Sequence, residues 1–188
     1  RDVMTLAHEL GHGVHQVLAG PQGALMSATP LTLAETASVF GEMLPFRPLL
    51  DRTTDKGERK AMLAQKVEDM INTVVRQIAF YQFERKVHAE RRNGELTSDR
   101  ICELWLSVQA ESLGPSVRFG DGYETFWAYI PHFIHSPFYV YAYAFGDCLV
   151  NSLYGVYQNA PAGFQDRYFE MLKAGGTKHH SELLAPFG

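Results

Sequence analysis

Apolar residues recur every three or four positions along most of the chain, which is the spacing of one face of an α-helix. The first stripe predicts a helix over about residues 2–19; it consists of Val3, Leu6, Ala7, Leu10, Val14, Val17 and Leu18. The pattern predicts further helices at about residues 31–44, 58–92, 98–113, 123–130 and 162–174, and a loop followed by a helix within residues 131–157. No alternation of apolar and polar residues lasts more than a few positions, so the predicted class is all-α, with a bundle-like arrangement.

Glycine, proline and capping residues mark where these helices should begin and end. Residues 20–23 close the first helix. Pro45 and Pro48 are expected to end the second, because proline lacks the N–H that a helix interior needs. Thr97 or Ser98 is expected to cap the helix that follows them. The pattern contains no repeat, and we predict a single helical domain over residues 1–188.

Composition agrees with a folded globular protein. The chain has 188 residues, 46% of them hydrophobic, which is enough for one domain with a substantial core. Its net charge of −4 gives no electrostatic reason to expect nucleic acid or an anionic membrane as a partner. The apolar run at residues 138–150 is shorter than the roughly 20 residues of a membrane-spanning helix, so we interpret it as a core helix.

The two cysteines and the first residues bear on the cellular compartment. Cys102 and Cys148 cannot form a disulfide framework, so we expect a reducing, cytoplasmic compartment. Both lie in apolar helical stretches, where we expect them to be buried. The chain opens on Arg1 without a basic and apolar leader, so no signal peptide is expected. Because a helix begins at once, we expect a fragment of a longer protein.

The strongest chemical signal is the segment His8-Glu9-Leu10-Gly11-His12. On a helix, His8 and His12 lie one turn apart on one face, about 6 Å along the axis, so both imidazoles can reach one zinc ion. Glu9 does not bind the metal, but it can reach a metal-bound water as general base. Zinc would lower the pKa of that water and polarise a scissile carbonyl. The segment therefore favours a metallopeptidase, and the alternative is two surface histidines beside a glutamate.

A catalytic zinc site needs a third protein ligand, and Glu35 is the candidate. It lies among apolar and small residues, where a carboxylate needs a partner, and 22 residues separate it from His12. That spacing fits a turn and a return, which would place the site between two antiparallel helices. Glu42, seven residues later, either holds a ligand imidazole or is a solvated surface residue. Two imidazoles and a carboxylate suit one Zn²⁺ ion, although cobalt or manganese could occupy the same ligands.

Two glycines flank His12 inside the predicted first helix. Glycine costs about 1 kcal/mol relative to alanine in a helix interior, so Gly11 and Gly13 indicate that a second backbone or the substrate passes close by. Tight helix packing and substrate approach both stay open. A di-iron site is disfavoured, because such bundles need a Glu-x-x-His pair from each of two helices and only Glu9 and His12 form one.

An aromatic segment at residues 130–143 is the second candidate for chemistry. Tyr139 and Tyr143 share a helix face, and His132 lies in the loop before them. Histidine and tyrosine can donate hydrogen bonds to the oxyanion that forms when water attacks a peptide carbonyl. The alternative is an aromatic core stripe, to which we assign Tyr141 in either case.

Together these motifs resemble the oligoendopeptidase F family, relatives of thimet oligopeptidase. The resemblance covers essentially the whole chain and rests on HELGH at 8–12, LAETASVFGE at 33–42, the aromatic segment extended to 130–146, and LKAGG at 172–176. It implies a gluzincin-type zinc oligopeptidase with an all-helical fold and a deep substrate channel.

The resemblance also assigns roles to residues. His8, His12 and Glu35 match the zinc ligands, and Glu9 matches the catalytic base. His132 and a helix tyrosine, Tyr143 first and Tyr139 second, match the residues that orient substrate and stabilise the oxyanion. His135 stands where the family leads us to expect a different aromatic residue.

We therefore predict a zinc-dependent metalloendopeptidase that cleaves short peptides, without a nucleic-acid or membrane partner. Because the family's members are far longer than this chain, the alternative is an inactive or incomplete helical zinc-binding module. A purely structural bundle would require His8, His12 and Glu35 to lie apart in space.

Overall fold

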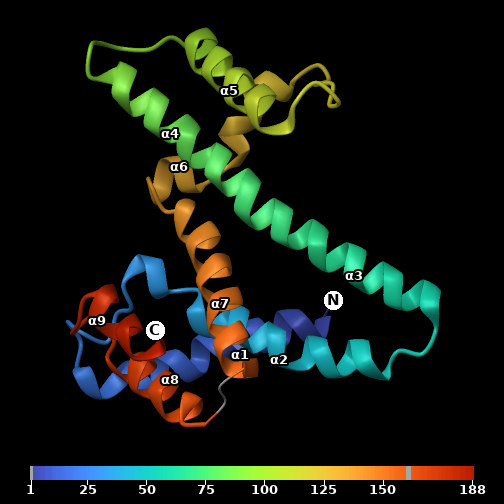
Figure 1. Ribbon diagram of the computed structural model, residues 1–188. Helices are drawn as coiled ribbons and strands as arrows, with labels where there is room; N and C mark the ends of the chain where they lie inside the picture. Colours follow the sequence, from blue (N-terminus) through green and yellow to red (C-terminus); the bar gives the residue numbers. More distant parts are fainter. Residues whose placement is uncertain (1, 160–161) are drawn as a thin grey trace. The chain divides into compact units, whose positions relative to one another are not determined.

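The computed structural model describes residues 2–159 and 162–188, and every regular element within these ranges is a helix (Figure 1). The predicted all-α class is therefore confirmed. The α-helices are α1 (Asp2–Ala19), α2 (Thr36–Arg52), α3 (Lys56–Ile71), α4 (Gln77–Arg91), α5 (Ser98–Leu113), α6 (His132–His135), α7 (Tyr141–Asn159), α8 (Phe164–Lys173) and α9 (His180–Leu184). The shorter elements are the 3-10 helices η1 (Gly20–Gln22), η2 (Leu31–Leu33), η4 (Tyr123–Tyr129) and η5 (Ala185–Phe187), and the π-helical segment η3 (Asn72–Arg76). Among the described helices, none combines the length and the apolar character needed to span a membrane.

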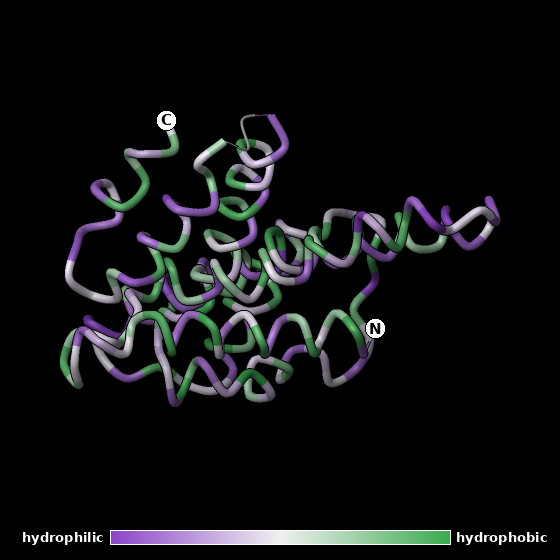
Figure 2. The backbone as a smooth tube through the Cα atoms, turned by 90° about the horizontal axis from the view of Figure 1, so that it is seen from below, coloured by the Kyte–Doolittle hydropathy of each residue, from purple (hydrophilic) through white to green (hydrophobic). Residues whose placement is uncertain are grey.

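The chain divides into two compact units, which are described separately. The first unit consists of Arg1–Glu68 and Phe145–Gly188, and the second of Asp69–Ala144. Apolar and hydrophilic stretches alternate along the helices of both units, as expected of helices with one buried face (Figure 2). The division into two compact units does not test the prediction of a single domain over residues 1–188, which stays a prediction.

The core of the first unit joins α2, α8, α9 and the second half of α7. The rings of Tyr154, Phe164 and Tyr168 surround Phe40 of α2, with centroids 4.7–5.8 Å from its own. The buried residues are Leu33, Ala37, Phe40, Val150, Leu153, Tyr154, Phe164, Tyr168, Met171, Leu172, Ala174 and Leu183. Burial of this apolar and aromatic surface stabilises the unit and holds α2 in place.

Helices α1 and α2 pack at unusually short range, because a glycine on each helix faces the backbone of the other helix. A Cβ atom placed on Gly11 would lie 2.6 Å from the Cα atom of Ser38, and closer still to the Ala37 carbonyl oxygen. A Cβ atom on Gly41 would lie 2.8 Å from the carbonyl oxygen of Ala7. The interpretation of Gly11 as a point of backbone approach is thus confirmed, whereas no described residue beyond the neighbouring backbone of α1 comes within 4 Å of the Cβ position of Gly13.

The apolar stripe that predicts α1 is not the face that α1 buries. Leu6 and Leu10 are each 60% exposed and Val17 is 78% exposed, while the buried residues of the helix are His15 and Ala19. The helix spans the predicted residues, but its contact with α2 depends on close backbone approach rather than on large apolar side chains.

The second unit has its own core between α4, α5 and the residues that follow them. Helices α4 and α5 lie side by side (Figure 1). Trp105 is fully buried and donates from Nε1 to the carbonyl of Tyr123 at 2.9 Å. The remaining buried members are Ala79, Phe80, Phe83, Leu104, Val108, Ile130 and Val140.

The limits predicted for the second helix are wrong. The second helix begins at Thr36, after a 3-10 turn, and it runs through Pro45 and Pro48 to Arg52. Each proline removes one backbone hydrogen bond, but buried Leu50 anchors the last turns of α2. The predicted helix at 58–92 is an unbroken succession of α3, the π-helical η3 and α4.

Other limits agree more closely, and two short helices are new. Thr97 is the N-cap of α5, and its side chain accepts a hydrogen bond from the N–H of Arg100. The helix expected at residues 123–130 is the 3-10 helix η4. Helices α6 and α9 fall where no helical periodicity is readable, because four- and five-residue helices are shorter than the repeat needed to detect them.

The predicted burial of the cysteines is wrong. Cys102 is half-buried, and Cys148 is exposed. On α7 the buried positions near it are Ala144, Gly146, Asp147 and Val150, and Cys148 lies outside the face that they form.

Candidate metal centre

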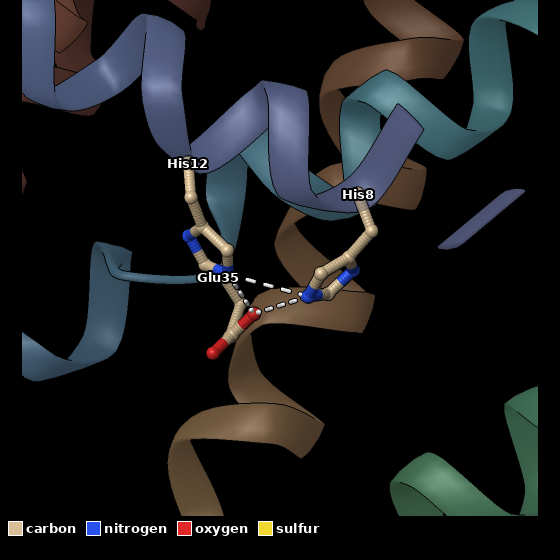
Figure 3. Close-up of side chains that lie close together, drawn as sticks. All are labelled: His8, His12 and Glu35. Atoms are coloured by element: carbon tan, nitrogen blue, oxygen red, sulfur yellow. Dashed lines mark hydrogen bonds and ion pairs between the residues drawn. The ribbon is translucent and has the colours of Figure 1, made fainter. Parts of the chain in front are cut away.

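His8, His12 and Glu35 come together in the first unit (Figure 3). Both histidines project from α1, one turn apart, toward the carboxylate of Glu35, which occupies the N-cap position of α2. The Nε2 atoms of the two imidazoles are 3.2 Å apart. They lie 3.5 and 3.4 Å from Oε2 of Glu35, respectively. The three atoms thus form a nearly equilateral triangle.

The triangle has the dimensions of a tetrahedral metal site. Ligand atoms about 2.1 Å from a tetrahedral zinc ion lie about 3.4 Å from one another. Two imidazole nitrogens and one carboxylate oxygen are a donor set that zinc accepts at catalytic sites, with the fourth position left for substrate or water. The residues present therefore fit a zinc ion in both geometry and chemistry.

Glu35 is held in place by the residues around its side chain. It is buried, and Ser38 donates a hydrogen bond from Oγ to Oε2 at 2.9 Å. Gly146 of α7 leaves room for it, since a Cβ atom at that position would lie 2.9 Å from Cβ of Glu35. A larger residue at 146 would therefore displace the carboxylate.

Glu42 contacts the imidazole of His8 directly. Its Oε1 lies 2.7 Å from Nδ1 of His8. This favours the interpretation of Glu42 as a residue that holds a ligand imidazole over the interpretation as a solvated surface residue. With the proton on Nδ1 and donated to Glu42, Nε2 keeps its lone pair for a metal.

The carboxylates around His8 also change its acidity. The hydrogen bond with Glu42 is the largest effect and raises the pKa of His8 above 6.5. Burial lowers it, while the charges of Glu42, Glu35 and Glu9 raise it further. Glu9 follows His8 on α1 and is exposed.

The predicted oxyanion residues form a second group, in the second unit. His132 begins α6 and Tyr139 lies before the start of α7, so the loop position predicted for His132 and the helix face predicted for Tyr139 and Tyr143 are both wrong. Nε2 of His132 lies 3.1 Å from the hydroxyl of Tyr143. The ring of Tyr139 lies 5.5 Å from that of His132 and 5.4 Å from that of Tyr143. All three are half-buried, whereas His135 is exposed. Tyr141 packs edge-on against Tyr81, as expected of a packing residue.

Two buried polar residues near the metal centre are absent from the sequence-based candidates. Asp147 is buried on α7; burial raises its pKa above 3.8, and the charge of Lys66 opposes this shift while that of Glu42 adds to it. His15 is buried on α1, where burial lowers its pKa and Thr29 Oγ1 lies 3.3 Å from its Nε2. Sequence features could have identified both residues, because Asp147 interrupts an apolar run and His15 is two helical turns from His8.

Comparison with known proteins identifies the family. The model of peptidase family M3 matches residues 1–188. The oligoendopeptidase F homolog of Borreliella burgdorferi is 32% identical over 98% of the chain and 31% of its own length. The chromosomal oligoendopeptidase F of Lactococcus lactis subsp. cremoris is 31% identical over 100% of the chain and 31% of its own length. The crystal structure of oligoendopeptidase-F from Enterococcus faecium superposes with a TM-score of 0.78 at 28% identity, over 98% of the chain and 33% of that structure. The chain thus spans about a third of the length of these relatives.

Proposed function

Because the chain belongs to peptidase family M3, we propose that it carries the zinc centre and the catalytic base of a metalloendopeptidase that hydrolyses short peptides. The observation that supports this most is the triangle of His8 Nε2, His12 Nε2 and Glu35 Oε2, with edges of 3.2–3.5 Å. His8 and His12 share helix α1, and Glu35 meets them from the start of α2 in a geometry suited to one zinc ion.

In this proposal His8, His12 and Glu35 hold the metal, and Glu42 orients His8. When bound, zinc would supply a Lewis acid that polarises the peptide carbonyl and makes water more acidic. Glu9 takes the proton from the attacking water and passes it to the leaving amine, which a carboxylate next to the site can do at neutral pH.

We assign stabilisation of the oxyanion to the group of His132, Tyr143 and Tyr139. The Tyr143 hydroxyl and the His132 ring lie within hydrogen-bond distance, so each constrains the orientation of the other. A donor that is already oriented loses little entropy when charge develops on the carbonyl oxygen. We keep Tyr143 as the first candidate and Tyr139 as the second.

An inactive zinc-binding module is the second candidate function. It is favoured by the length of the chain, which covers only about a third of its relatives. A short peptide is the proposed partner of the metalloendopeptidase, whereas the zinc-binding module requires no peptide. A cytoplasmic location is part of both proposals, and fractionation of cells that produce the full protein would test it.

Metal analysis and peptide hydrolysis separate these candidates. We expect about one zinc ion per chain by elemental mass spectrometry after dialysis at neutral pH. Absence of bound zinc after zinc addition would overturn both candidates. Zinc binding without cleavage of internally quenched short peptides would support the module.

The variant Glu9→Gln tests the general base. It should retain zinc, because Glu9 is not a ligand, and lose most peptide hydrolysis, because the amide cannot accept the proton. The matched control is Glu58→Gln, an exposed residue in the first turn of α3, which should keep both. Turnover near that of the unmodified chain would show that Glu9 is not the base.

A further inference from the structure

The turn that connects α6 to α7 has a strained backbone. It spans Ser136 to Tyr139 and is closed by a hydrogen bond from the N–H of Tyr139 to the carbonyl of Ser136, at 3.2 Å. Pro137 followed by a positive φ is the pattern of a type II turn, which favours glycine or asparagine at its third position. Here that position is Phe138, at φ 61°, and no other non-glycine residue of the described chain has a positive φ. Other contacts must therefore hold this conformation.

Glu84 of α4 supplies one such contact. Its Oε1 accepts a hydrogen bond from the N–H of Phe138 at 2.8 Å. The residue is 2% exposed, and within the described part of the chain its second carboxylate oxygen has no hydrogen-bond partner. Burial raises the pKa of Glu84, which favours the neutral carboxyl form. Burial of a carboxyl group with only one hydrogen-bond partner destabilises the folded state, unless that one hydrogen bond stabilises a local structure.

The same face of α4 also contacts the side chain of Phe138. The rings of Tyr81 and His88 lie 6.4 and 4.7 Å from that of Phe138, respectively. Tyr81, Glu84 and His88 are three and four residues apart, so they share one face of the helix. This face therefore holds both the backbone and the side chain of the strained residue.

We propose that Glu84 is a positioning residue, which holds the α6–α7 turn in its strained conformation and thereby fixes the distance between His132 and Tyr143. The turn is the only covalent connection between α6, which carries His132, and α7, which carries Tyr143. The inference rests on the proposed function in one respect: the catalytic effect assumes that His132 and Tyr143 act on the substrate. The structural effect on the turn does not depend on that assumption.

Two substitutions of Glu84 distinguish positioning from general stability. Glu84→Gln keeps an oxygen that can accept from the Phe138 N–H and resembles the neutral carboxyl group. Glu84→Leu keeps the approximate volume and removes the acceptor. The matched control is Arg85→Leu, an exposed residue at the next position of α4. Each zinc-loaded protein is assayed for kcat, KM, zinc content and amide hydrogen exchange of residues 136–143.

We expect Glu84→Leu to lower kcat about tenfold to hundredfold while KM changes less than about threefold, because small displacements of aligned groups have effects of that size. Amide exchange in the turn should accelerate, and exchange in α5 and the zinc content should stay as they are. Glu84→Gln and Arg85→Leu should stay within about threefold of the unmodified protein in every measurement. A folded Glu84→Leu variant with normal kcat, or a Glu84→Gln variant with an equal loss, would overturn the proposal.

Two further outcomes remain decisive. If the zinc-loaded unmodified protein cleaves no peptide, the peptidase candidate fails, and amide exchange alone tests the role of Glu84. Faster exchange of the turn in Glu84→Leu, but not in Glu84→Gln, then supports that role, and equal exchange in both variants overturns it. If Glu84→Leu does not fold, it is combined with Phe138→Gly, since glycine adopts the positive φ freely. The combined variant should then fold and match Phe138→Gly alone within about threefold in turn exchange. A larger difference, or failure to fold, would show that Glu84 serves the whole core rather than the turn.

Discussion

Replacement of Gly11 by alanine should disrupt the metal centre without removing any ligand. A Cβ atom at this position would lie 2.6 Å from the Cα atom of Ser38, whereas carbon atoms in ordinary contact are about 3.5–4.0 Å apart. Helices α1 and α2 would have to separate by about 1 Å to relieve the overlap. The neighbouring atoms are backbone, so no side-chain rotation can absorb it.

The displacement acts directly on the ligand triangle, because two of its three edges cross from α1 to the start of α2. Metal sites tolerate deviations of only about 0.2 Å in ligand distance, so a shift of this size should weaken zinc binding at least about tenfold. Overpacking of this kind also costs about 1–3 kcal/mol in the free energy of unfolding. Zinc affinity is measured by competition with a chromogenic chelator, and stability by urea unfolding of the metal-free protein.

Gly13→Ala is the internal control, since it adds the same methyl group two residues further along the same helix. Among the described residues, nothing beyond the neighbouring backbone of α1 lies within 4 Å of that Cβ position, and the residue is exposed. Alanine should therefore raise the free energy of unfolding by about 0.5–1 kcal/mol and leave zinc affinity as it is. Equal zinc affinities for Gly11→Ala and Gly13→Ala would refute the argument that backbone contact sets the ligand geometry.

Two further predictions concern carboxylates near the site. Glu42→Leu should lower zinc affinity about tenfold to hundredfold in the same competition assay, because His8 loses the group that orients it; an affinity like that of Glu58→Gln would contradict this. Asp147→Asn should alter the pH dependence of stability: burial raises the folded-state pKa above 3.8, so the unmodified protein loses stability relative to the variant as pH rises from about 3.8 through that pKa. Urea unfolding of both metal-free proteins across this range measures the difference, and a constant difference would show that Asp147 has the same pKa in the folded and unfolded states.

The parts of the site that lie close together in the sequence are predictable from it. His8 and His12 meet because helical geometry fixes the direction of residues four apart, and the predicted limits of α1 agree with the structure. Glu35 is predictable because a carboxylate in an apolar stretch needs a partner. Glu42 follows from its spacing to Glu35, but only the fold shows that it contacts His8.

Features that depend on distant contacts are not predictable in this way. Local rules end α2 at Pro45, yet tertiary packing continues it to Arg52. The periodicity of α1 marks a stripe that is largely exposed, because the helix contacts α2 through a residue without a side chain. In the sequence Glu84 is one charged residue among many on a long helix, and its role becomes visible only from its hydrogen bond with the Phe138 N–H.

Because of the glycines around the ligand triangle, the distances between the metal ligands depend little on the identity of other residues. At Gly11 and Gly41 the backbones of α1 and α2 come close together, and at Gly146 the backbone of α7 comes close to the Glu35 side chain. The distance between the ligands therefore does not depend on a large side chain placed between these elements. Core residues such as those around Phe40 can then be exchanged for others of similar volume with little effect on the metal ligands. The centre can therefore keep one geometry while the surrounding sequence diverges, provided that these three positions gain no side chain.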